Sequence, residues 1–454
     1  MPMVPLQQQI PPEHDLLYHE MRAAYEGDPE TWRRLTEARR DAIVEYARGR
    51  SAYYRRTIPP GAAFEDIPLL TKDLLRAHHE DLLAVDARDP RIYEQKTSGS
   101  TGVPLHFYRD RAQTLAESVS SDRFFRWLHD VPFEATIIAV LATTRSEQDF
   151  IRWTRLRRAV RAATGRAPLP DPWLLTLPMT DVRPGDLPEY FRRWARLRSY
   201  FLVGHSSGID WVAQQVEDGH VAPPPPPVAI AATSDTLTEH SRMRIERVFG
   251  LRLHSRYGSA EVPFLAASMP ERIDRYLFNP LLAYVEILRD DGTPARPGEV
   301  GTIVLTDLNN RVMPVIRYRQ GDLATVSTLD AVGGFAVVES IIGRESELLR
   351  FPSGRVLGAS GLGQLLFKRH HFAPWVRYYQ CAQVGDNAIE LRVVWAKEPG
   401  DVRERMASVV RDAADPDTEV RVVGVEDVDR LPSGKVWVIR REDASASSTA
   451  EPVR

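Results

Sequence analysis

Residues 97–104 read Thr97-Ser98-Gly99-Ser100-Thr101-Gly102-Val103-Pro104 and directly follow an extended stretch at residues 91–96. The two glycines allow backbone conformations that are closed to other residues, so successive amide groups and neighbouring hydroxyls can converge on one anion. A loop of this kind can hold a polyphosphate. It lacks the Lys-Ser/Thr pair that a Walker-type loop carries after its last glycine. A plain surface turn is the alternative, and the rest of the sequence has to decide between them.

The composition is that of a soluble globular protein with two or three domains. The chain has 454 residues, of which 43% are hydrophobic and 27% charged, and this length exceeds one hydrophobic core. No apolar run is long enough to span a bilayer, and the start, Met1-Pro2-Met3-Val4-Pro5, lacks the features of a secretory signal. We therefore expect a cytoplasmic protein with no membrane partner.

Charge and cysteine content exclude several classes of function. A net charge of −3 gives no electrostatic footprint for nucleic acid. Cys381 is the only cysteine, which excludes intrachain disulfides and a cysteine-rich zinc site. The arginine-rich run at residues 152–166 predicts an exposed helix, with polynucleotide binding as the less favoured alternative. Lysines are scarce and stand only at positions 72, 96, 368, 397 and 435.

Alternating helix and strand signals predict an α/β fold with a largely parallel sheet. Helical spacing covers residues 12–56, and a further helix is expected at residues 112–129. Continuous apolar runs at residues 135–142 and 228–232 are typical of buried strands. The small polar tail at residues 444–454 is expected to be disordered.

Later segments supply groups that could complete a nucleotide site with the loop. Tyr257 beside Gly258 offers a flat face on which a base can stack, and Glu261 can hold Mg²⁺ near a phosphate. Asp322 ends a β-rich run, where a carboxylate can accept both hydroxyls of a ribose. Lys435 is presented by a Ser-Gly turn. The four segments are residues 255–261, 314–322, 343–355 and 431–435.

Each of these groups also has a purely structural explanation. Glu261 could be a charge at a helix N-terminus, Asp322 a turn former and Lys435 a solvated lysine. The adjacent pairs His78-His79 and His370-His371 do not converge on one metal, so surface or packing roles are favoured for them. The order and separation of the four segments favour the functional interpretation of the set.

In this order and with these separations, the segments resemble the adenylate-forming superfamily of acyl-CoA synthetases, peptide-synthetase adenylation domains and luciferases. Within it the chain is most similar to the phenylacetate–CoA ligase branch and its capsule-biosynthesis relatives, on residues 67–72, 232–237 and 314–318. The resemblance covers residues 30–442. It implies a large multi-layer α/β body at residues 1–343, which binds ATP and the acid, and a small mobile α+β lid domain at residues 344–443.

The resemblance implies that ATP and Mg²⁺ are the cofactors. Residues 97–102 would embrace the β- and γ-phosphates, and Glu261 would help to bind Mg²⁺. Lys435 would reach both the substrate carboxylate and the α-phosphate, where a compact ammonium offsets the repulsion between two anions. Arg344 would contact the ribose or a phosphate. Lys435, Glu261 and Arg344 form the expected catalytic set.

The adenosine and acid contacts follow from the same resemblance. Tyr257 would stack on adenine, and Ser234 with Asp235 would line its edge, while Asp322 would take the ribose hydroxyls. His205 and Phe264 are expected in the acid pocket, with ordinary core packing as the alternative for Phe264. The residues expected to bind the nucleotide are Thr97, Ser98, Gly99, Ser100, Thr101, Gly102, Ser234, Asp235, Arg256, Tyr257, Gly258, Ser259 and Asp322.

The implied reaction is the ATP-dependent activation of a small carboxylic acid as an acyl-adenylate, with release of pyrophosphate and transfer of the acyl group to a thiol. Coenzyme A is the default acceptor. A carrier-protein thiol, an amine acceptor that gives an amide, and a small oxyacid such as nitrite as the substrate stay open. So does the choice between a monomer and a homodimer.

Departures from the pattern support a rival of another class, a non-catalytic nucleotide- or acyl-binding homologue. Ala260 stands where the family usually places a hydroxyl, and Ser346 stands where its hinge usually has Asp or Lys. Retention of Lys435, Glu261 and Asp322 counts against this rival. The cysteine cluster of some relatives is absent between residues 330 and 342, which argues against zinc.

Overall fold

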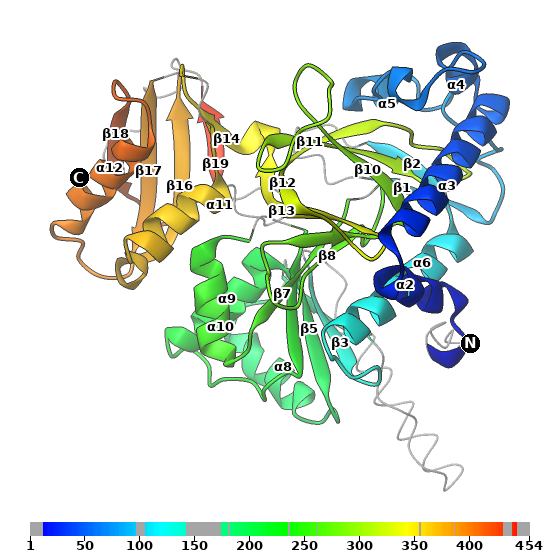
Figure 1. Ribbon diagram of the computed structural model, residues 1–454. Helices are drawn as coiled ribbons and strands as arrows, with labels where there is room; N and C mark the ends of the chain where they lie inside the picture. The colour runs from blue at the N-terminus through cyan, green and yellow to red at the C-terminus, as the bar shows by residue number, and fades with distance from the viewer. Residues whose placement is uncertain are drawn as a thin grey trace, which may run out of the picture.

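The computed structural model describes residues 12–96, 105–141, 174–179, 182–234, 237–259, 261–353, 356–385, 387–429 and 438–442. The predictions for residues 152–166 and 444–454 fall outside these ranges. Figure 1 shows a large body built on one long sheet and a smaller C-terminal part beside it.

The first described residues form helices, as the spacing of residues 12–56 predicts. The longer helices start at side chains that accept a hydrogen bond from the first turn. Asp15 caps α2 (Leu16–Glu26), and Asp28 caps α3 (Pro29–Arg50) with its carboxylate 2.8 Å from the amide of Thr31. The other short elements before the first strand are η1 (Pro12–His14), α4 (Ala52–Thr57), η2 (Phe64–Asp66) and α5 (Lys72–Ala77).

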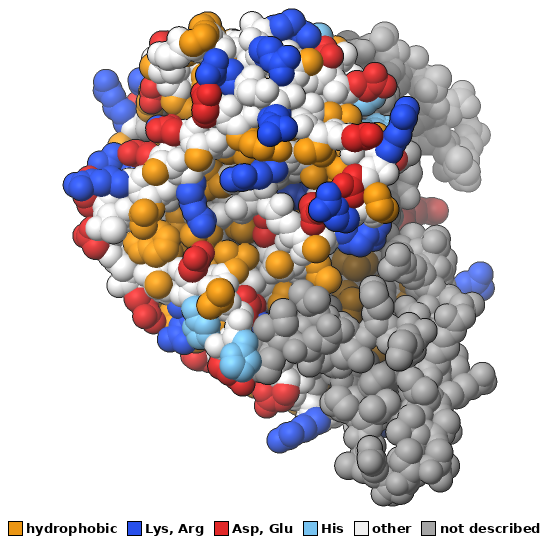
Figure 2. Space-filling model, turned by 90° about the vertical axis from the view of Figure 1, so that its right-hand side faces the viewer, with side chains coloured by type: hydrophobic (Ala, Val, Ile, Leu, Met, Phe, Trp, Pro, Cys, Tyr) orange, Lys and Arg blue, Asp and Glu red, His pale blue; other side chains and the backbone are white. Residues whose placement is uncertain are grey.

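Charged side chains of both signs are interspersed on the face formed by these helices. Figure 2 shows acidic, basic and hydrophobic side chains side by side over this face. Pairs one turn apart on α3 produce part of the mixture, such as Arg33–Glu30 at 2.8 Å and Arg48–Glu45 at 2.6 Å. A mixture of this kind creates no extended field of one sign on this face.

Within the described residues, one sheet of eleven strands runs through the body, and five neighbouring strands are parallel. Residues 135–140 and 229–232 are buried, as the two apolar runs predict, whereas Val228 at the start of the second run is exposed and residue 142 lies outside the described ranges. In β3 (Thr136–Leu141), Ile138 and Val140 pack on one face and Ile137 and Ala139 on the other. The other parallel strands are β4 (Leu174–Pro178), β5 (Tyr200–His205), β6 (Ala229–Thr233) and β7 (Leu253–Tyr257).

The rest of this sheet is antiparallel, so the expectation of a largely parallel sheet was wrong for this half. Tight turns join several of its strands, and antiparallel pairs need no crossover helix. Gly333 and Gly334 form the two-residue link between β12 (Tyr318–Val332) and β13 (Phe335–Arg344), a turn that hairpins favour. The other strands are β8 (Ala266–Ser268), β9 (Tyr276–Phe278), β10 (Ala283–Leu288) and β11 (Val300–Asp307).

Helices cover both faces of the parallel strands (Figure 1). One face is covered by α6 (Arg111–Leu128), which matches the helix predicted at residues 112–129. The other face is covered by α8 (Leu187–Trp194), α9 (Ser206–Glu217) and α10 (Glu239–Phe249), and η3 (Pro184–Asp186) leads into α8. This layering confirms the α/β fold class.

The C-terminal part has its own sheet and its own hydrophobic core. The sheet order is β18-β17-β16-β19, and the core runs from Leu349 to Ile439. The large sheet ends with β13 at Arg344, next to the proposed domain boundary at residue 343. The elements are η4 (Glu345–Glu347), β14 (Leu348–Arg350), β15 (Val356–Gly358), α11 (Ala359–Gly363), η5 (Gln364–Arg369), η6 (Ala373–Trp375), β16 (Val376–Val384), β17 (Ala388–Trp395), α12 (Val402–Ala413), β18 (Glu419–Gly424) and β19 (Ile439–Glu442).

Helix α10 joins the two parts. Arg244 Nη2 donates a hydrogen bond of 2.8 Å to the carbonyl of Arg377, and the rings of His240 and Phe367 lie 4.7 Å apart. Across the described residues, no helix has both the length and the apolar character that crossing a membrane requires.

Candidate active site

The carboxyl ends of neighbouring parallel strands bring several predicted site residues to one edge of the sheet. His205 ends β5, Ser234 follows β6, and Tyr257 ends β7. His205 pairs with Thr233, the last residue of β6. In open α/β sheets, ligands bind outside this edge of the strands. Three of the predicted residues therefore share the edge where a ligand is expected.

Tyr257 and Asp322 are in direct contact. The Tyr257 hydroxyl donates a hydrogen bond of 2.6 Å to Oδ2 of Asp322, and Gln320 Nε2 donates to the same oxygen over 3.1 Å. Gln320 also donates to the Tyr257 oxygen. Burial and the Asp322 carboxylate raise the pKa of Tyr257, so the phenol stays protonated and remains the donor. These three residues form the tyrosine cluster.

Arg344 lies beside this cluster because β12 and β13 pair in register at Asp322 and Arg344. Its Nε atom is 3.9 Å from Oδ1 of Asp322, and 40% of the Arg344 side chain is exposed. A partly exposed guanidinium at this position can reach an anionic ligand that binds beside Asp322.

Lys72, at the start of α5, is a site residue that the sequence interpretation missed. Burial and Arg344 lower the pKa of its ammonium, and the carboxylates of Asp322 and Glu261 oppose this effect. A Cβ placed on Gly321 would lie 3.6 Å from Lys72 Nζ. The sequence offered one signal for Lys72, because it is one of few lysines in an arginine-rich chain.

Backbone pairing explains why Lys72 reaches the site. Leu70 forms a parallel bridge with Tyr318, the first residue of β12. The amide of Leu70 donates to the carbonyl of Arg317 over 3.0 Å, and the amide of Arg319 donates back to Leu70 over 2.9 Å. This pairing holds the N-terminal segment against the strand that carries Asp322.

Glu261 is buried, with 5% of its surface exposed. Its backbone carbonyl accepts a hydrogen bond from Arg109, whose guanidinium also pairs with Asp307 at 2.9 Å and Glu117 at 3.0 Å. Arg109 lies on β2 (His106–Asp110), which pairs with β1 (Ile92–Lys96). The predicted phosphate loop joins these two strands in the sequence, so Arg109 connects the strand after that loop to the Glu261 backbone.

The turn before Glu261 explains the small residues of the motif. A Cβ on Gly258 would lie 2.6 Å from the amide nitrogen of Phe264, so only glycine fits there without displacement. The Ser259 hydroxyl accepts from the amide of Val262 over 3.3 Å, and the Ser259 amide donates to the Val262 carbonyl over 3.1 Å. Gly258 and Ser259 therefore shape the segment that presents Glu261.

Arg256 was expected at the nucleotide, but its side chain lies on the other side of β7. Successive side chains of a strand point to opposite faces, so Arg256 turns toward α6 while Tyr257 turns toward Asp322. Its Nη2 atom is 2.7 Å from Oδ1 of Asp122, and its guanidinium lies 4.0 Å from the ring centre of Phe125. The Arg256 side chain therefore lies on the face of β7 opposite to Tyr257 and Asp322.

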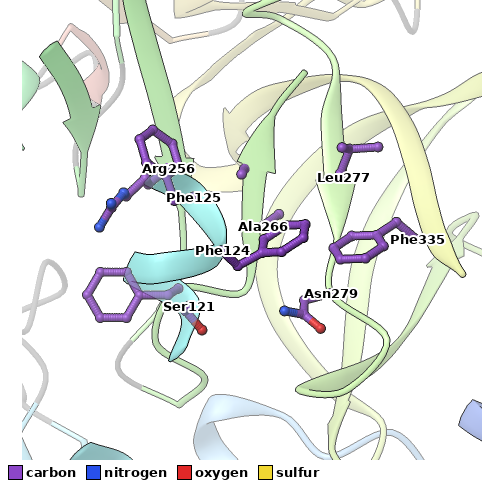
Figure 3. A pocket seen from close by; sticks show the side chains of 10 residues that line it. Ser121, Phe124, Phe125, Arg256, Ala266, Leu277, Asn279 and Phe335 are labelled. Carbon is purple, nitrogen blue, oxygen red and sulfur yellow. The ribbon is translucent and has the colours of Figure 1, made fainter. Parts of the chain in front are cut away.

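Phe264 lines a small pocket of about 20 Å³ on the α6 side of β7 (Figure 3). His205 does not line this pocket. In Figure 3, Arg256 and Phe125 lie at one end, and Leu277 and Phe335 lie at the other. The lining residues are Ser121, Phe124, Phe125, Arg256, Phe264, Ala266, Ala267, Leu277, Asn279 and Phe335.

Positive backbone φ angles at non-glycine residues occur in the segments around the site. Ser234 has a φ of 74°, Phe264 of 55° and Arg317 of 46°. Such conformations cost free energy and persist where the surrounding structure enforces them, often next to functional groups. Their positions support the choice of these segments as the site.

Several predicted site residues lie outside the described residues. They are Thr97, Ser98, Gly99, Ser100, Thr101, Gly102, Asp235 and Lys435, together with Ala260. Their roles stay predictions.

Comparisons with known proteins agree with the motifs. The chain is 20% identical over 334 residues to protein CapK of Staphylococcus aureus, covering 70% of this chain and 68% of CapK. It is 32% identical over 140 residues to phenylacetate-coenzyme A ligase of Escherichia coli strain K12, covering 30% and 32% of the two chains. No family model matches the chain.

The fold is similar to that of 2-hydroxyisobutyryl-CoA ligase in its postadenylation state, with a TM-score of 0.72, 17% identity and coverage of 93% and 91% of the two chains. The chain is therefore similar, in sequence and in fold, to members of the adenylate-forming superfamily. The same ligase in its thioesterification state gives a TM-score of only 0.57. The two parts of the chain are therefore arranged more like those of the ligase in its postadenylation state.

Proposed function

We propose that the chain is an adenylate-forming ligase that activates a small carboxylic acid with ATP and passes the acyl group to a thiol, with coenzyme A as the first candidate. The observation that carries the proposal is the grouping of Tyr257, Asp322, Arg344 and Glu261 at one edge of the sheet. Two of the similar proteins are coenzyme A ligases by name, which supports the choice of acceptor.

The tyrosine cluster would hold the nucleoside. Asp322 already accepts two hydrogen bonds at Oδ2, from Tyr257 and Gln320, and its other oxygen faces Arg344 at 3.9 Å. Ribose hydroxyls would donate to this carboxylate, and charge-assisted bonds of this kind contribute roughly 1.5 to 3 kcal/mol each. The Tyr257 ring would stack on the base.

In the first step, a carboxylate oxygen of the acid would attack the α-phosphorus of ATP. The bond from that phosphorus to the bridging oxygen breaks, and pyrophosphate leaves with the electron pair. Both reactants are anions, so positive charge between them stabilises the transition state. Lys435 is proposed to supply that charge, with Lys72 and Arg344 beside the phosphates.

In the second step, the sulfur of a thiol would attack the acyl carbonyl carbon. A carbon–sulfur bond forms, the carbon–oxygen bond to the phosphate breaks, and AMP leaves, while the thiol proton passes to solvent. The chain would need to expose the adenylate to the thiol at this point, which the superfamily resemblance assigns to rotation of the C-terminal part.

Glu261 fits a magnesium ion that is held jointly by the protein and the substrate. Among the residues that the structure describes, no group of three or more His, Cys, Asp or Glu could hold a metal. Mg²⁺ commonly binds one or two carboxylates together with substrate phosphates, and Glu261 would supply such a carboxylate. The ion would neutralise charge on the phosphates.

Pyrophosphate release in the presence of ATP, Mg²⁺ and a panel of carboxylic acids tests this proposal. At least one acid should stimulate release, and Lys435→Ala should reduce the rate by about 100- to 1000-fold while ATP still binds. Adding coenzyme A or an amine to preformed adenylate then identifies the acceptor. If ATP binds but no acid, including nitrite, stimulates release, the non-catalytic alternative replaces the proposal.

A further inference from the structure

The pocket on the α6 side of β7 is next to the proposed reaction site. Arg256 immediately precedes Tyr257, and Phe264 follows Glu261 by three residues, so both ends of the segment that carries the site residues wall the pocket. Strand β7 separates the pocket from the tyrosine cluster. A molecule in the pocket could therefore meet the nucleotide only around the carboxyl end of β7, where the reaction is proposed.

The pocket borders a buried excess of positive charge. The carboxylate of Asp122 is shared between Arg126, at 2.7 Å, and Arg256, also at 2.7 Å. These three residues are between 1% and 6% exposed. One carboxylate cannot neutralise two guanidinium groups, and burying a charge without a partner is costly.

Other charged groups around α6 pair with partners other than Arg126 and Arg256. Asp15 is paired with Arg123 at 2.8 Å, and Arg109 is shared by Glu117 at 3.0 Å and Asp307 at 2.9 Å, so the opposite excess of charge lies in a separate cluster. His254, on β7, lies 4.1 Å from His129, ring to ring. Burial lowers the pKa of His129 to about 2 and that of His254 to about 4, so both rings are neutral.

Two buried donors in the pocket wall lack a partner. Among the described residues, neither Arg256 Nε nor the Ser121 hydroxyl makes a hydrogen bond. Both residues are buried, with 6% of Arg256 and 7% of Ser121 exposed. An unsatisfied buried donor costs about 1 to 3 kcal/mol. The remaining lining is largely aromatic and aliphatic, so these two donors are the groups that a polar ligand would meet in the pocket.

We propose that this pocket binds the end of the acid that does not react, and that it selects a short acid with a second carboxylate, which Arg256 and Ser121 bind. The inference rests on the proposed function. A guanidinium matches the geometry of a carboxylate and binds it with charge-assisted hydrogen bonds. A volume of about 20 Å³ exceeds only slightly the roughly 10 to 15 Å³ that one water requires, so an aromatic ring does not fit and only a small polar end group is compatible with the pocket.

Matched acids of equal chain length test the proposal. The series pairs malonate, succinate and glutarate with propionate, butyrate and pentanoate, and it adds 4-hydroxybutyrate and phenylacetate. At the best chain length, kcat/KM for pyrophosphate release should be about 10- to 100-fold higher for the diacid than for the monoacid, which corresponds to one charge-assisted contact. Phenylacetate should be a poor substrate.

Arg256→Met should abolish the preference for the diacid and leave KM for ATP unchanged. It leaves Asp122 and Arg126 as a one-to-one pair, so the core keeps a neutral cluster. Ser121→Ala should reduce the preference without touching that ion pair, which provides a second measure if Arg256→Met folds poorly. Arg252→Met, at an exposed position just before β7, is the matched control and should keep the parental preference.

Calorimetric titration with the same acids separates this inference from the proposed function. Arg256-dependent binding of a diacid by a protein that releases no pyrophosphate would support the pocket and contradict the ligase. Pyrophosphate release with monoacids, hydroxy acids or phenylacetate at least as efficient as with every diacid would support the ligase and overturn the pocket assignment. A diacid preference that survives in Arg256→Met and Ser121→Ala would overturn it as well.

Discussion

The carboxylate of Asp322 accepts hydrogen bonds from Tyr257 and Gln320 and faces Arg344. Asp322→Asn keeps the shape of the side chain and removes its charge. ATP should bind about 10- to 100-fold more weakly, because charge-assisted bonds to the ribose are lost. Equilibrium titration with ATP measures this effect. Tyr257→Phe keeps the aromatic face and serves as the comparison with a smaller expected loss; equal affinities of the Asn variant and the parent would place the nucleotide elsewhere.

Lys72 provides a second prediction at this scale. Its ammonium interacts with Asp322, Glu261 and Arg344, so Lys72→Met should lower kcat/KM for ATP by about tenfold or more through loss of one charged contact. Lys397→Met is the matched control, because Lys397 lies over the ring of Trp375 at 4.3 Å in the C-terminal part. Steady-state kinetics of both variants measure kcat/KM for ATP. A similar loss in both would assign no special role to Lys72.

The buried face of helix α6 carries charged side chains as well as the aromatic rings of Phe124 and Phe125. His129 caps its C-terminal end, and burial lowers the pKa of His129 to about 2, below the ordinary value of 6.5. The unfolded chain therefore binds a proton more readily than the folded one. The stabilising contribution of neutral His129 is complete above about pH 6.5 and is lost as the pH falls below it.

His129→Phe should consequently reduce the acid sensitivity of the fold. Each neutral buried histidine costs about 1.4 kcal/mol of unfolding free energy per pH unit below its unfolded pKa. Urea unfolding between pH 7 and pH 4 should show a shallower decline for the variant than for the parent. His14→Phe, at an exposed position, should follow the parent, and an identical slope in all three proteins would contradict the assignment.

At the scale of the whole molecule, the proposed two-step reaction depends on how the C-terminal part is positioned against the body. The contact of Arg244 with the Arg377 carbonyl holds them together in the arrangement described, and the proposed hinge at residues 343–347 joins β13 to β14. Packed domains do not deform gradually, so a change of state must be absorbed at such a junction. Ser346→Pro fixes φ and removes an amide donor there.

The half-reaction that follows adenylation should suffer more from Ser346→Pro, because the present arrangement resembles a postadenylation state more than a thioesterification state. Pyrophosphate release and consumption of preformed adenylate, measured separately, test this expectation. Ser346→Ala keeps the amide and should leave both rates near the parental values. Equal losses with proline would indicate misfolding, and unchanged rates would show that the junction does not swing.

The sequence by itself indicated the candidate site residues and determined much of the local structure. Spacing and residue type predicted the N-terminal helices, α6, β3 and β6, because amphipathic period and continuous apolar runs are local properties. The local pattern also predicted Asp322 in a loop after a strand, which was wrong, because Asp322 lies inside β12 and pairs with Arg344 of β13. It missed the antiparallel half of the sheet, since strand direction depends on which strands pair.

Only the tertiary structure decided which of these groups meet. Lys72 reaches the site because Leu70 pairs with Tyr318, a contact between segments far apart in the sequence. Arg256 and Tyr257 are neighbours in one motif, yet the pleat of β7 sends them to opposite faces, one toward Asp122 and the other toward Asp322. Pairing and register are long-range properties of the folded chain, and they decide on which face of the sheet each side chain lies.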